Sequence, residues 1–427
     1  MFTHSKLDSG LSLITAPIEG SKTTTVLAMI ATGSKYETRE QSGLSHFLEH
    51  MFFKGTTKRP NAHAISSELD KIGAEFNAFT SKEYTGYYVK VASDNMDTAI
   101  DVVSDMLNNP LLDGEEIKRE SGVIVEEVNM YLDNPMWFIE DLFEDLLYGD
   151  TPAGWSTIGT KENIKGFTRE DFVNYYQSQY VPGNSIVIIA GQVPANPEAW
   201  VTKYFNTAND KSAKAKLATT ENQTTPASRL HYKKTDQSHL SLGVRTFAYG
   251  HVDAPILKLI SLALGGSMSS RLFINLRERN GLAYYVRTGA ESYTDTGYLT
   301  TQAGVPVDKL EDAVKIIINE YSRLTSELIS DEELSKLKGL IHGKLPLSLE
   351  GSDDTAQWYA SQAVTLKQQN SDKALKTPEE FLAAIDKVTA EDIQRLAKEI
   401  FKTETLNLAI IGPYENIDNL KPLLEIK

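Results

Sequence analysis

The stretch Gly43–Lys54, GLSHFLEHMFFK, decides how the rest of the chain is interpreted. Apolar residues cover almost all sides of the helix that this stretch predicts, so the helix should be buried. His46 and His50 are four residues apart and Glu49 is three residues after His46, which places all three on one face. Such groups are costly to bury without partners. Two neutral imidazoles in this arrangement can bind a divalent ion while the carboxylate reaches a water on that ion.

This pattern is rare by chance. The chain has 427 residues and 8 His, and a composition of this kind predicts about 0.01 such patterns. The alternative is a pair of hydrogen-bonded core histidines. The other histidines lack the spacing of metal ligands and should be structural or exposed: His4, His63, His231, His239, His251 and His342.

The absence of cysteine restricts the third ligand of a metal. With 0 Cys, the chain cannot form disulfides, thiolate metal sites or a cysteine nucleophile, so a further ligand must be His, Asp or Glu. In a helix expected over 114–132, Glu120 and Glu127 lie seven residues apart on the face of its apolar stripe. We predict that Glu127 is the third zinc ligand and that Glu120 orients a histidine. The alternative is that both are surface acids.

Charge and hydropathy limit the partners. The chain has 43 Lys and Arg against 58 Asp and Glu, a net charge of -15, which disfavours nucleic acid and anionic membranes as partners. Apolar runs such as 26–31 and 186–190 are far shorter than the roughly 20 residues of a membrane-spanning helix. Residues 1–17 show no secretory or mitochondrial targeting pattern. We expect a soluble, cytoplasmic protein without a membrane partner.

The pattern along the chain favours an α+β fold, because strands and helices alternate without a strict βαβ rhythm. In the first half we expect strands over 11–16, 24–32 and 186–191, helices over 43–54, 61–72, 95–107 and 114–132, and a hairpin over 74–91.

A polar, small-residue segment at the midpoint of the chain, within 207–228, indicates a linker. On either side of it, 94–106 resembles 308–321, and each half closes with an apolar strand that ends in glycine, at 186–191 and 406–412. We therefore expect two related halves, 1–210 and 229–427, joined by a linker over 211–228. The alternative is that any two α+β domains share these patterns.

Beyond these features, the chain resembles the pitrilysin/insulinase-type zinc peptidases, a family that includes the mitochondrial processing peptidase and its bacterial relatives. The inverted motif His-x-x-Glu-His is their signature. In this family a glutamate follows the second histidine by 77 positions and another precedes it by seven, which matches Glu127 and Glu120. The segments 47–56, 75–80 and 180–184 also look like family segments. The resemblance implies two mixed α/β halves, with mostly antiparallel sheets, arranged as a clam-shell.

The second half resembles the family at 269–272, 276–278 and 281–284. The resemblance implies that Arg277 and Tyr284, seven residues apart, reach the active site from the opposite half, where they hold the substrate backbone and the oxyanion. By spacing alone, Arg277 would be a surface ion-pair partner. The positions opposite the motif are Ile256, Leu259 and Ile260, so the second half should be degenerate and the chain should hold one zinc ion.

We predict a zinc-dependent endopeptidase in which Glu49 takes a proton from the attacking water and then gives a proton to the leaving amine. The resemblance implies that a peptide adds as an extra strand beside Asn77, Ala78, Phe79 and Thr80. Pairing through the main chain suits unfolded or short peptides that can enter an enclosed space.

Three further points follow. Family members of this length often pair, so we expect a homodimer. A non-catalytic zinc-binding scaffold or processing subunit of the same family is one alternative function. The other is a metal-dependent hydrolase that cleaves a different bond.

Overall fold

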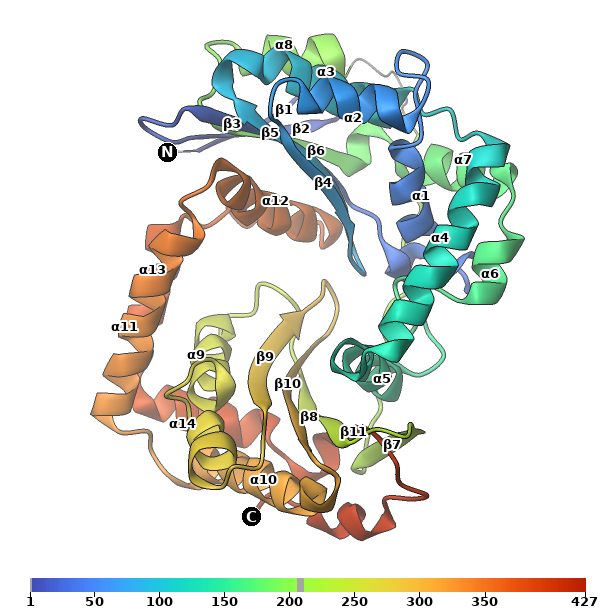
Figure 1. Ribbon diagram of the computed structural model, residues 1–427. Coiled ribbons are helices and arrows are strands. Elements are labelled where there is room, and N and C mark those ends of the chain that lie inside the picture. Colours follow the sequence, from blue (N-terminus) through green and yellow to red (C-terminus); the bar gives the residue numbers. More distant parts are fainter. Residues whose placement is uncertain (1, 206–210) are drawn as a thin grey trace. The chain divides into compact units, whose positions relative to one another are not determined.

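The computed structural model describes residues 2–205 and 211–427, so residues 206–210, where the expected first half ends, lie outside the described part. The chain forms two compact units. The first comprises Met1–Asn129, Trp155–Leu217 and Pro346–Leu375, and the second comprises Met130–Gly154, Ala218–Leu345 and Lys376–Lys427. Each unit contains one sheet with helices packed on it (Figure 1).

The sheet of the first unit has the order β1-β2-β6-β3-β5-β4. Only β2 and β6 are parallel neighbours, and the other pairs are antiparallel. Its strands are β1 (Thr3–Lys6), β2 (Ser12–Pro17), β3 (Thr23–Ile30), β4 (Glu75–Thr80), β5 (Thr85–Ala92) and β6 (Ser185–Gly191). Strand β4 forms one edge of this sheet.

The sheet of the second unit repeats this topology. Its order is β7-β11-β8-β10-β9, which corresponds strand by strand to β2-β6-β3-β5-β4, with β7 and β11 as the parallel pair. Its strands are β7 (Ala227–Tyr232), β8 (Gln237–Thr246), β9 (Tyr285–Ser292), β10 (Gly297–Pro306) and β11 (Leu406–Gly412). Matching topology is what two related halves would produce.

The helices also occur in a matching order relative to the strands, except that α8, after β6, has no α-helical counterpart after β11 in the described residues. Those of the first half are α1 (Leu44–Phe52), α2 (Ala62–Asp70), α3 (Met96–Asn108), α4 (Gly114–Asp133), α5 (Pro135–Tyr148), α6 (Lys161–Gly166), α7 (Arg169–Gln179) and α8 (Pro197–Tyr204). Those of the second half are α9 (Ala254–Gly265), a π-helix (Phe273–Arg279), α10 (Leu310–Ser326), α11 (Asp331–Ser348), α12 (Ser352–Gln368), α13 (Pro378–Asp386) and α14 (Ala390–Ile400).

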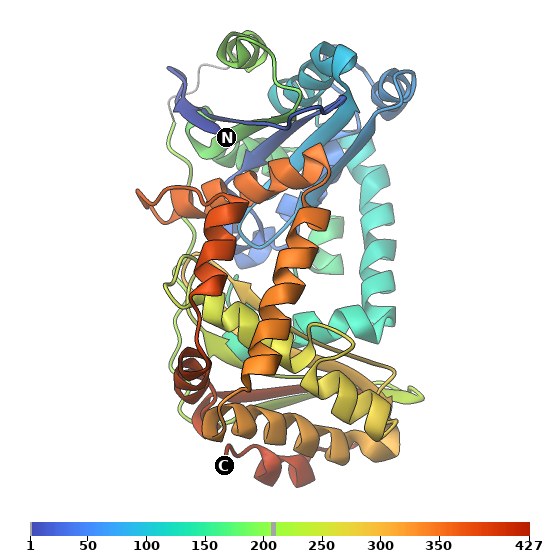
Figure 2. The same cartoon turned by 90° about the vertical axis from the view of Figure 1, so that its left-hand side faces the viewer.

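Each unit takes one helix from the other half of the sequence. Helix α12 packs on β3 and β6 of the first sheet, and α5 packs on β8 and β11 of the second sheet. Figures 1 and 2 show α12 on one face of the first sheet and α2, α3 and α8 on the other. The hydroxyl of Ser352, at the start of α12, lies 3.1 Å from that of Thr23 and 2.8 Å from that of Thr25.

Helices on both faces explain the continuous apolar runs. Val26, Ala28 and Ile30 of β3 belong to the core that includes α3, while the alternate residues Leu27 and Met29 are buried on the opposite face, where α12 packs. In the second unit, Leu408 and Ile410 of β11 belong to the core with α9, α10 and α14, while Ala409 and Ile411 pack with α5. Strands covered on two faces need apolar residues at every position.

The predicted α+β fold class is confirmed, with two mixed α/β halves and mostly antiparallel sheets. Within residues 2–205 and 211–427, no helix has both the length and the apolar character needed to cross a membrane.

Candidate metal centre

Helix α1 carries the predicted motif, and its start is held in place. Gly43 precedes the helix with a φ of 98°, and a Cβ atom there would lie 2.7 Å from the carbonyl oxygen of Ile158. The carboxylate of Glu37 accepts hydrogen bonds from the backbone N–H groups of Gly43 (2.8 Å) and Ser45 (2.6 Å). Burial raises the pKa of Glu37 to about 8, although those backbone bonds act in the opposite direction. The first turn of α1 therefore has a fixed position.

The apolar face of α1 is fully buried, as predicted. Leu44, Phe47, Leu48 and Phe52 are each 0% exposed, and they pack in the core of the first unit. The other face presents His46, Glu49 and His50, whose side chains are partly buried. The rings of His46 and His50 lie one turn apart, with centroids separated by 4.8 Å.

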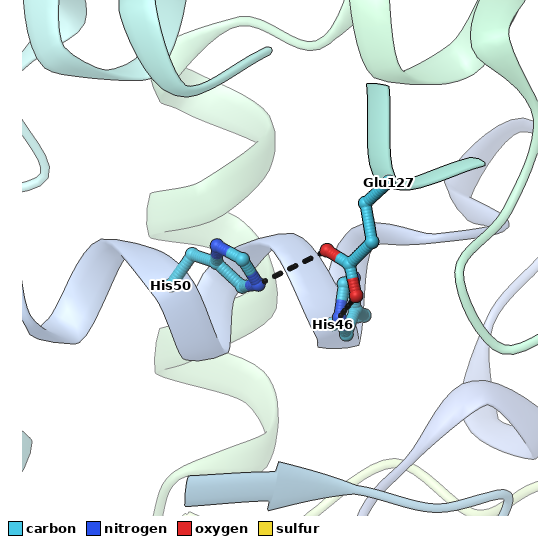
Figure 3. Close-up of side chains that lie close together, drawn as sticks. All are labelled: His46, His50 and Glu127. Carbon is cyan, nitrogen blue, oxygen red and sulfur yellow. Dashed lines mark ion pairs between the residues drawn. The ribbon is translucent and has the colours of Figure 1, made fainter. Parts of the chain in front are cut away.

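Helix α4 brings Glu127 to the two histidines (Figure 3). Glu127 Oε1 lies 3.7 Å from His46 Nε2, and Glu127 Oε2 lies 3.6 Å from His50 Nε2. Each of the three residues offers one ligand atom, and these three atoms all lie within 4.8 Å of one another. Within the described part of the chain, this is the group of His, Asp and Glu residues that could hold a metal ion.

The donor set fits zinc. Ligand atoms on a tetrahedral zinc ion are about 3.3 Å apart. Small side-chain rotations would therefore bring the His46, His50 and Glu127 ligand atoms to the spacing that zinc requires. The pKa of His46 falls to about 3, because burial and the charge of His50 disfavour its protonated form. A neutral imidazole is the form that binds a metal. Two His and one carboxylate, with a fourth position left for water or substrate, form a typical catalytic zinc set.

Glu120 lies beside His50, where the sequence predicted an orienting carboxylate. Its Oε1 is 2.9 Å from His50 Nδ1, and its Oε2 is 2.5 Å from Lys54 Nζ. Burial alone would raise the pKa of Glu120, but the hydrogen bonds from His50 and Lys54 outweigh burial, and the pKa is lowered. Among the described residues, His46 Nδ1 is buried without a hydrogen-bond partner. The two imidazoles are thus held differently.

Glu49 lies on the same face of α1 and contacts Thr80 of β4. Its Oε2 accepts a hydrogen bond of 2.5 Å from the hydroxyl of Thr80. Burial raises the pKa of Glu49, while the bond from Thr80 and the charge of His50 act in the opposite direction. Thr80 therefore touches the predicted proton acceptor directly.

The expected substrate strand is an edge strand next to α1. β4 pairs with β5 and contacts α1, and its other edge has no neighbouring strand in the described sheet. Asn77 is exposed, and its side-chain oxygen accepts the backbone N–H of Ala78 at 2.9 Å. The ring of Phe79 lies over Gly86, where a Cβ atom would come within 2.2 Å of that ring.

Arg277 and Tyr284 belong to the second unit, whereas His46, His50 and Glu127 belong to the first. Arg277 lies in the last turn of the π-helix, with its guanidinium 5.0 Å from the centre of the Phe273 ring. Tyr284 is 74% exposed and immediately precedes β9. In the described second half, Ile256, Leu259 and Ile260 are buried apolar residues of α9, which cannot bind a metal.

Sequence reasoning missed two residues and one contact. Glu37 holds the start of α1, but nothing in the local sequence separates it from other acids. Lys54 follows His50 by four residues, and this spacing could have indicated that it shares the same helix face. Thr80 was expected to bind substrate, and its contact with Glu49 spans 31 residues of sequence.

Comparisons with known proteins agree with this geometry. The profile of the insulinase family (peptidase family M16) matches residues 14–161, which include α1 and α4, and that of the peptidase M16 inactive domain matches residues 166–340. A Bacillus subtilis protein named uncharacterized zinc protease YmxG is 36% identical, over 91% of this chain and 92% of that protein. An uncharacterized zinc protease of Rickettsia felis is 33% identical, over 96% of this chain and 98% of that protein.

Solved structures show the same fold. A protease from Helicobacter pylori has a TM-score of 0.90 with 25% identity, over 97% of this chain and 99% of that chain. A chain of complex III2 from Candida albicans has a TM-score of 0.83 with 15% identity, over 99% of both chains, which shows likeness of fold alone. Zinc is the metal named for the sequence relatives, and His46, His50 and Glu127 form a cluster that could bind it. The chain belongs to the insulinase family of zinc metallopeptidases, peptidase family M16.

Proposed function

We propose that the chain is a zinc-dependent endopeptidase that hydrolyses unfolded or short peptides. The observation that carries the proposal is the convergence of His46, His50 and Glu127, whose ligand atoms lie within 4.8 Å of one another. Glu49 lies on the same face of α1 as the two histidines. A metal-ligand set beside a carboxylate that is not itself a ligand is the arrangement used for metal-assisted hydrolysis.

A zinc ion held by His46, His50 and Glu127 supplies Lewis acidity, which makes a water acidic near neutral pH and polarises a peptide carbonyl. Glu49 is the proposed proton carrier. Its carboxylate accepts the proton of the attacking water and later delivers a proton to the nitrogen of the leaving amine. The hydrogen bond from Thr80 holds one oxygen of Glu49, so the other oxygen is left to face the water.

We also propose that the peptide binds along β4. An edge strand offers unpaired N–H and C=O groups, and an extended peptide can pair with them. Asn77, Ala78, Phe79 and Thr80 are the residues of β4 that we assign to this role. Main-chain pairing requires an extended segment, which favours unfolded or short peptides over folded proteins.

Arg277 and Tyr284 are proposed to hold the substrate backbone and the oxyanion. Support comes from the resemblance of 276–278 and 281–284 to the family and from the exposure of both side chains on the second unit. An arginine and a phenol are suitable donors to an oxygen on which negative charge develops.

The decisive experiment compares the wild type with Glu49→Gln. Both proteins are assayed for zinc content and for cleavage of a panel of quenched unstructured peptides. We expect about one zinc per chain in both, and a loss of at least a hundredfold in cleavage rate in the variant only.

Other outcomes contradict the proposal in distinct ways. Zinc in both proteins without cleavage of any peptide would indicate a non-catalytic zinc-binding subunit. Turnover of small amides or esters without peptide cleavage would indicate a hydrolase of another bond. Zinc absent from both, with no activity sensitive to chelators, would contradict the metal centre.

We further propose that the protein acts as a homodimer, because family members of this length often pair and this chain carries both the zinc motif and the Arg277/Tyr284 pair. Sedimentation equilibrium should give twice the mass of one chain. A mass near that of one chain would contradict this proposal.

A further inference from the structure

Lys54, which lies just outside the zinc motif, contacts the carboxylate that supports His50. It follows His50 by four residues, just after α1 ends, and its Nζ lies 2.5 Å from Glu120 Oε2. The other oxygen of the same carboxylate, Glu120 Oε1, lies 2.9 Å from His50 Nδ1. Glu120 is buried, with a side chain only 8% exposed, so its two oxygens are occupied by one ligand imidazole and one ammonium group.

We propose that Lys54 is a positioning residue of the metal centre, which orients Glu120 so that Glu120 in turn orients the His50 imidazole toward the metal. This inference rests on the metal centre described above, and it does not depend on which bond the enzyme cleaves. Lys54 is not a metal ligand and need not contact substrate.

The physical reason lies in how a carboxylate rotates. The last torsion of a Glu side chain is broad and has no sharp minimum, so a single hydrogen bond leaves the plane of the carboxylate loosely defined. The ammonium of Lys54 on Oε2 fixes that plane and keeps Oε1 aimed at His50. It also provides the opposite charge that a buried carboxylate requires.

The contacts from Lys54 through Glu120 to His50 matter because the imidazole of His46 has no equivalent hydrogen-bonded support in the described residues. Within the described residues, His46 Nδ1 has no hydrogen-bond partner, so no hydrogen bond at that nitrogen orients the ring. Partners on the far nitrogen of a ligand histidine set its tautomer and orientation, and their loss typically weakens metal binding by about 10–100-fold. The Lys54–Glu120–His50 chain is therefore the one hydrogen-bonded support of a histidine ligand that the described residues provide.

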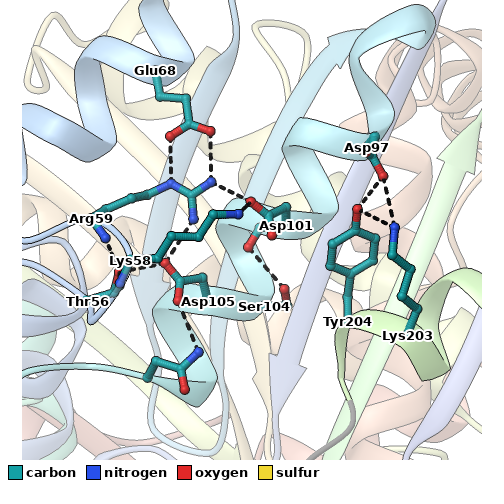
Figure 4. A network of polar contacts seen from close by, with 11 residues as sticks. Thr56, Lys58, Arg59, Glu68, Asp97, Asp101, Ser104, Asp105, Lys203 and Tyr204 are labelled. Carbon is teal, nitrogen blue, oxygen red and sulfur yellow. Dashed lines mark hydrogen bonds and ion pairs between the residues drawn. The ribbon is translucent and has the colours of Figure 1, made fainter.

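Lys54 is itself held in place. Its backbone N–H donates to the carbonyl of Met51 at 3.1 Å. The loop that follows is anchored by Arg59, a buried residue whose guanidinium binds Glu68, Asp101 and Asp105 at 2.6–2.8 Å (Figure 4). The ammonium thus extends from a fixed backbone.

The same loop offers a matched control. Lys58 lies four residues after Lys54 and forms an ion pair with Asp101 in the network of Figure 4. In the described residues, neither Lys58 nor Asp101 forms an ion pair with Glu120. Its side chain is 58% exposed. Lys58→Met removes the same charge from the same loop without touching the metal centre.

The test measures zinc affinity by competition with a chromogenic chelator, using the full chain. We expect Lys54→Met to raise the zinc Kd about tenfold or more, and Lys58→Met to change it less than twofold. In a Glu120→Gln background, Lys54→Met should add less than a twofold change, because the carboxylate through which it acts is gone. Thermal unfolding of the zinc-free proteins checks that each variant folds, and Lys54→Gln replaces Lys54→Met if the latter does not.

A Kd changed less than twofold by Lys54→Met would overturn the inference. An equal loss of zinc affinity in Lys58→Met would also overturn it. So would a full loss of zinc affinity on adding Lys54→Met in the Glu120→Gln background. A wild-type chain that binds no zinc would overturn the metal centre and the inference together. A wild-type chain that binds zinc but cleaves no peptide would contradict only the proposed peptidase function.

Discussion

At the scale of single residues, the candidate site depends on hydrogen bonds to carboxylates. Glu49 receives one from Thr80, and Glu120 receives two, from His50 and Lys54. Each bond fixes an oxygen that would otherwise rotate freely. Because catalysis and metal binding need atoms placed within a fraction of an ångström, such bonds matter more for rate and affinity than for stability.

Thr80→Val tests whether the hydroxyl of Thr80 positions Glu49. Valine has nearly the same shape but cannot donate a hydrogen bond, so the carboxylate of Glu49 loses its anchor. We expect kcat to fall about 10–100-fold, with zinc content and KM little changed. Steady-state kinetics on a quenched peptide, together with metal analysis, measures this.

Two further variants serve as controls for Thr80→Val. Thr80→Ser keeps the hydroxyl and should retain most of the rate. Thr57→Val makes the same substitution at an exposed threonine of the loop after α1 and should leave kcat unchanged. If Thr80→Val keeps the full kcat, then the hydroxyl of Thr80 does not position Glu49. A raised KM with an unchanged kcat would show that Thr80 acts on substrate instead.

At the scale of elements, the position of α1 decides the geometry of the site. Gly43 allows the helix to begin where the backbone passes close to Ile158, and Glu37 holds the first turn through two backbone N–H groups. Such a carboxyl group at a helix N-terminus accepts hydrogen bonds from donors that have no partner within the helix. His46 follows directly in this first turn, so the cap fixes the start of the metal site.

The pKa of Glu37 leads to a prediction about stability and pH. Its pKa is about 8 in the folded protein, raised by burial, against 4.5 for the ordinary group. Between these values the unfolded chain releases a proton that the folded chain keeps, so this contribution to stability is full below pH 4.5 and is lost as pH rises through 8. From pH 6 to pH 8 the wild type should therefore lose about 2 kcal/mol more stability than Glu37→Gln.

Urea unfolding at pH 6, 7 and 8 checks this expectation. Glu40→Gln is the matched control, because Glu40 is exposed and lies only three residues further along the chain. The pH dependence of that variant should follow the wild type. A Glu37→Gln protein with an unchanged pH dependence would show that Glu37 does not titrate in this range.

At the scale of the whole molecule, the two sequence halves are interdependent. Helix α12 comes from the second half but covers β3 and β6 of the first unit, and α5 comes from the first half but covers β8 and β11 of the second. Leu27 and Met29 of β3 are buried on the face that α12 covers. Removing one half therefore uncovers the sheet of the other.

A fragment of residues 1–210 should not fold alone. It lacks α12 and also carries the apolar face of α5, including Ile139 and Phe143, without the sheet that buries it. Each large side chain contributes roughly 1.5–3 kcal/mol when buried, so exposing several exceeds the 5–15 kcal/mol stability typical of a domain. We expect this fragment to aggregate or to bind the dye ANS, and to bind no zinc.

Coexpression with residues 211–427 provides the complementary measurement. The two fragments together should restore one zinc site per pair, because each then supplies the helix that the other lacks. A fragment of residues 1–210 that is monomeric, cooperative in unfolding and able to bind zinc alone would contradict this dependence.

Local sequence determined most of the elements. The apolar runs predicted β3, β6 and β11, and the 3.6-residue period predicted α1, α3 and α4 within a few residues of their observed bounds. The candidate ligand set followed from residue type and spacing. Without cysteine, a third ligand beside two histidines had to be His, Asp or Glu, and Glu127 was one of two acids on an apolar stripe. These properties depend on neighbours along one helix or strand, which the sequence lists in order.

Tertiary structure alone decided the rest. The exchange of α5 and α12 joins segments from the two halves of the sequence, and no local pattern marks which sheet an amphipathic helix will cover. In the same way, the contacts of Thr80 with Glu49 and of Lys54 with Glu120 join different elements. The sequence by itself determined which residues could bind zinc, because that depends on residue type and helical spacing. Only the folded chain decided which side chains hold those residues in place, because hydrogen bonds depend on distances in space.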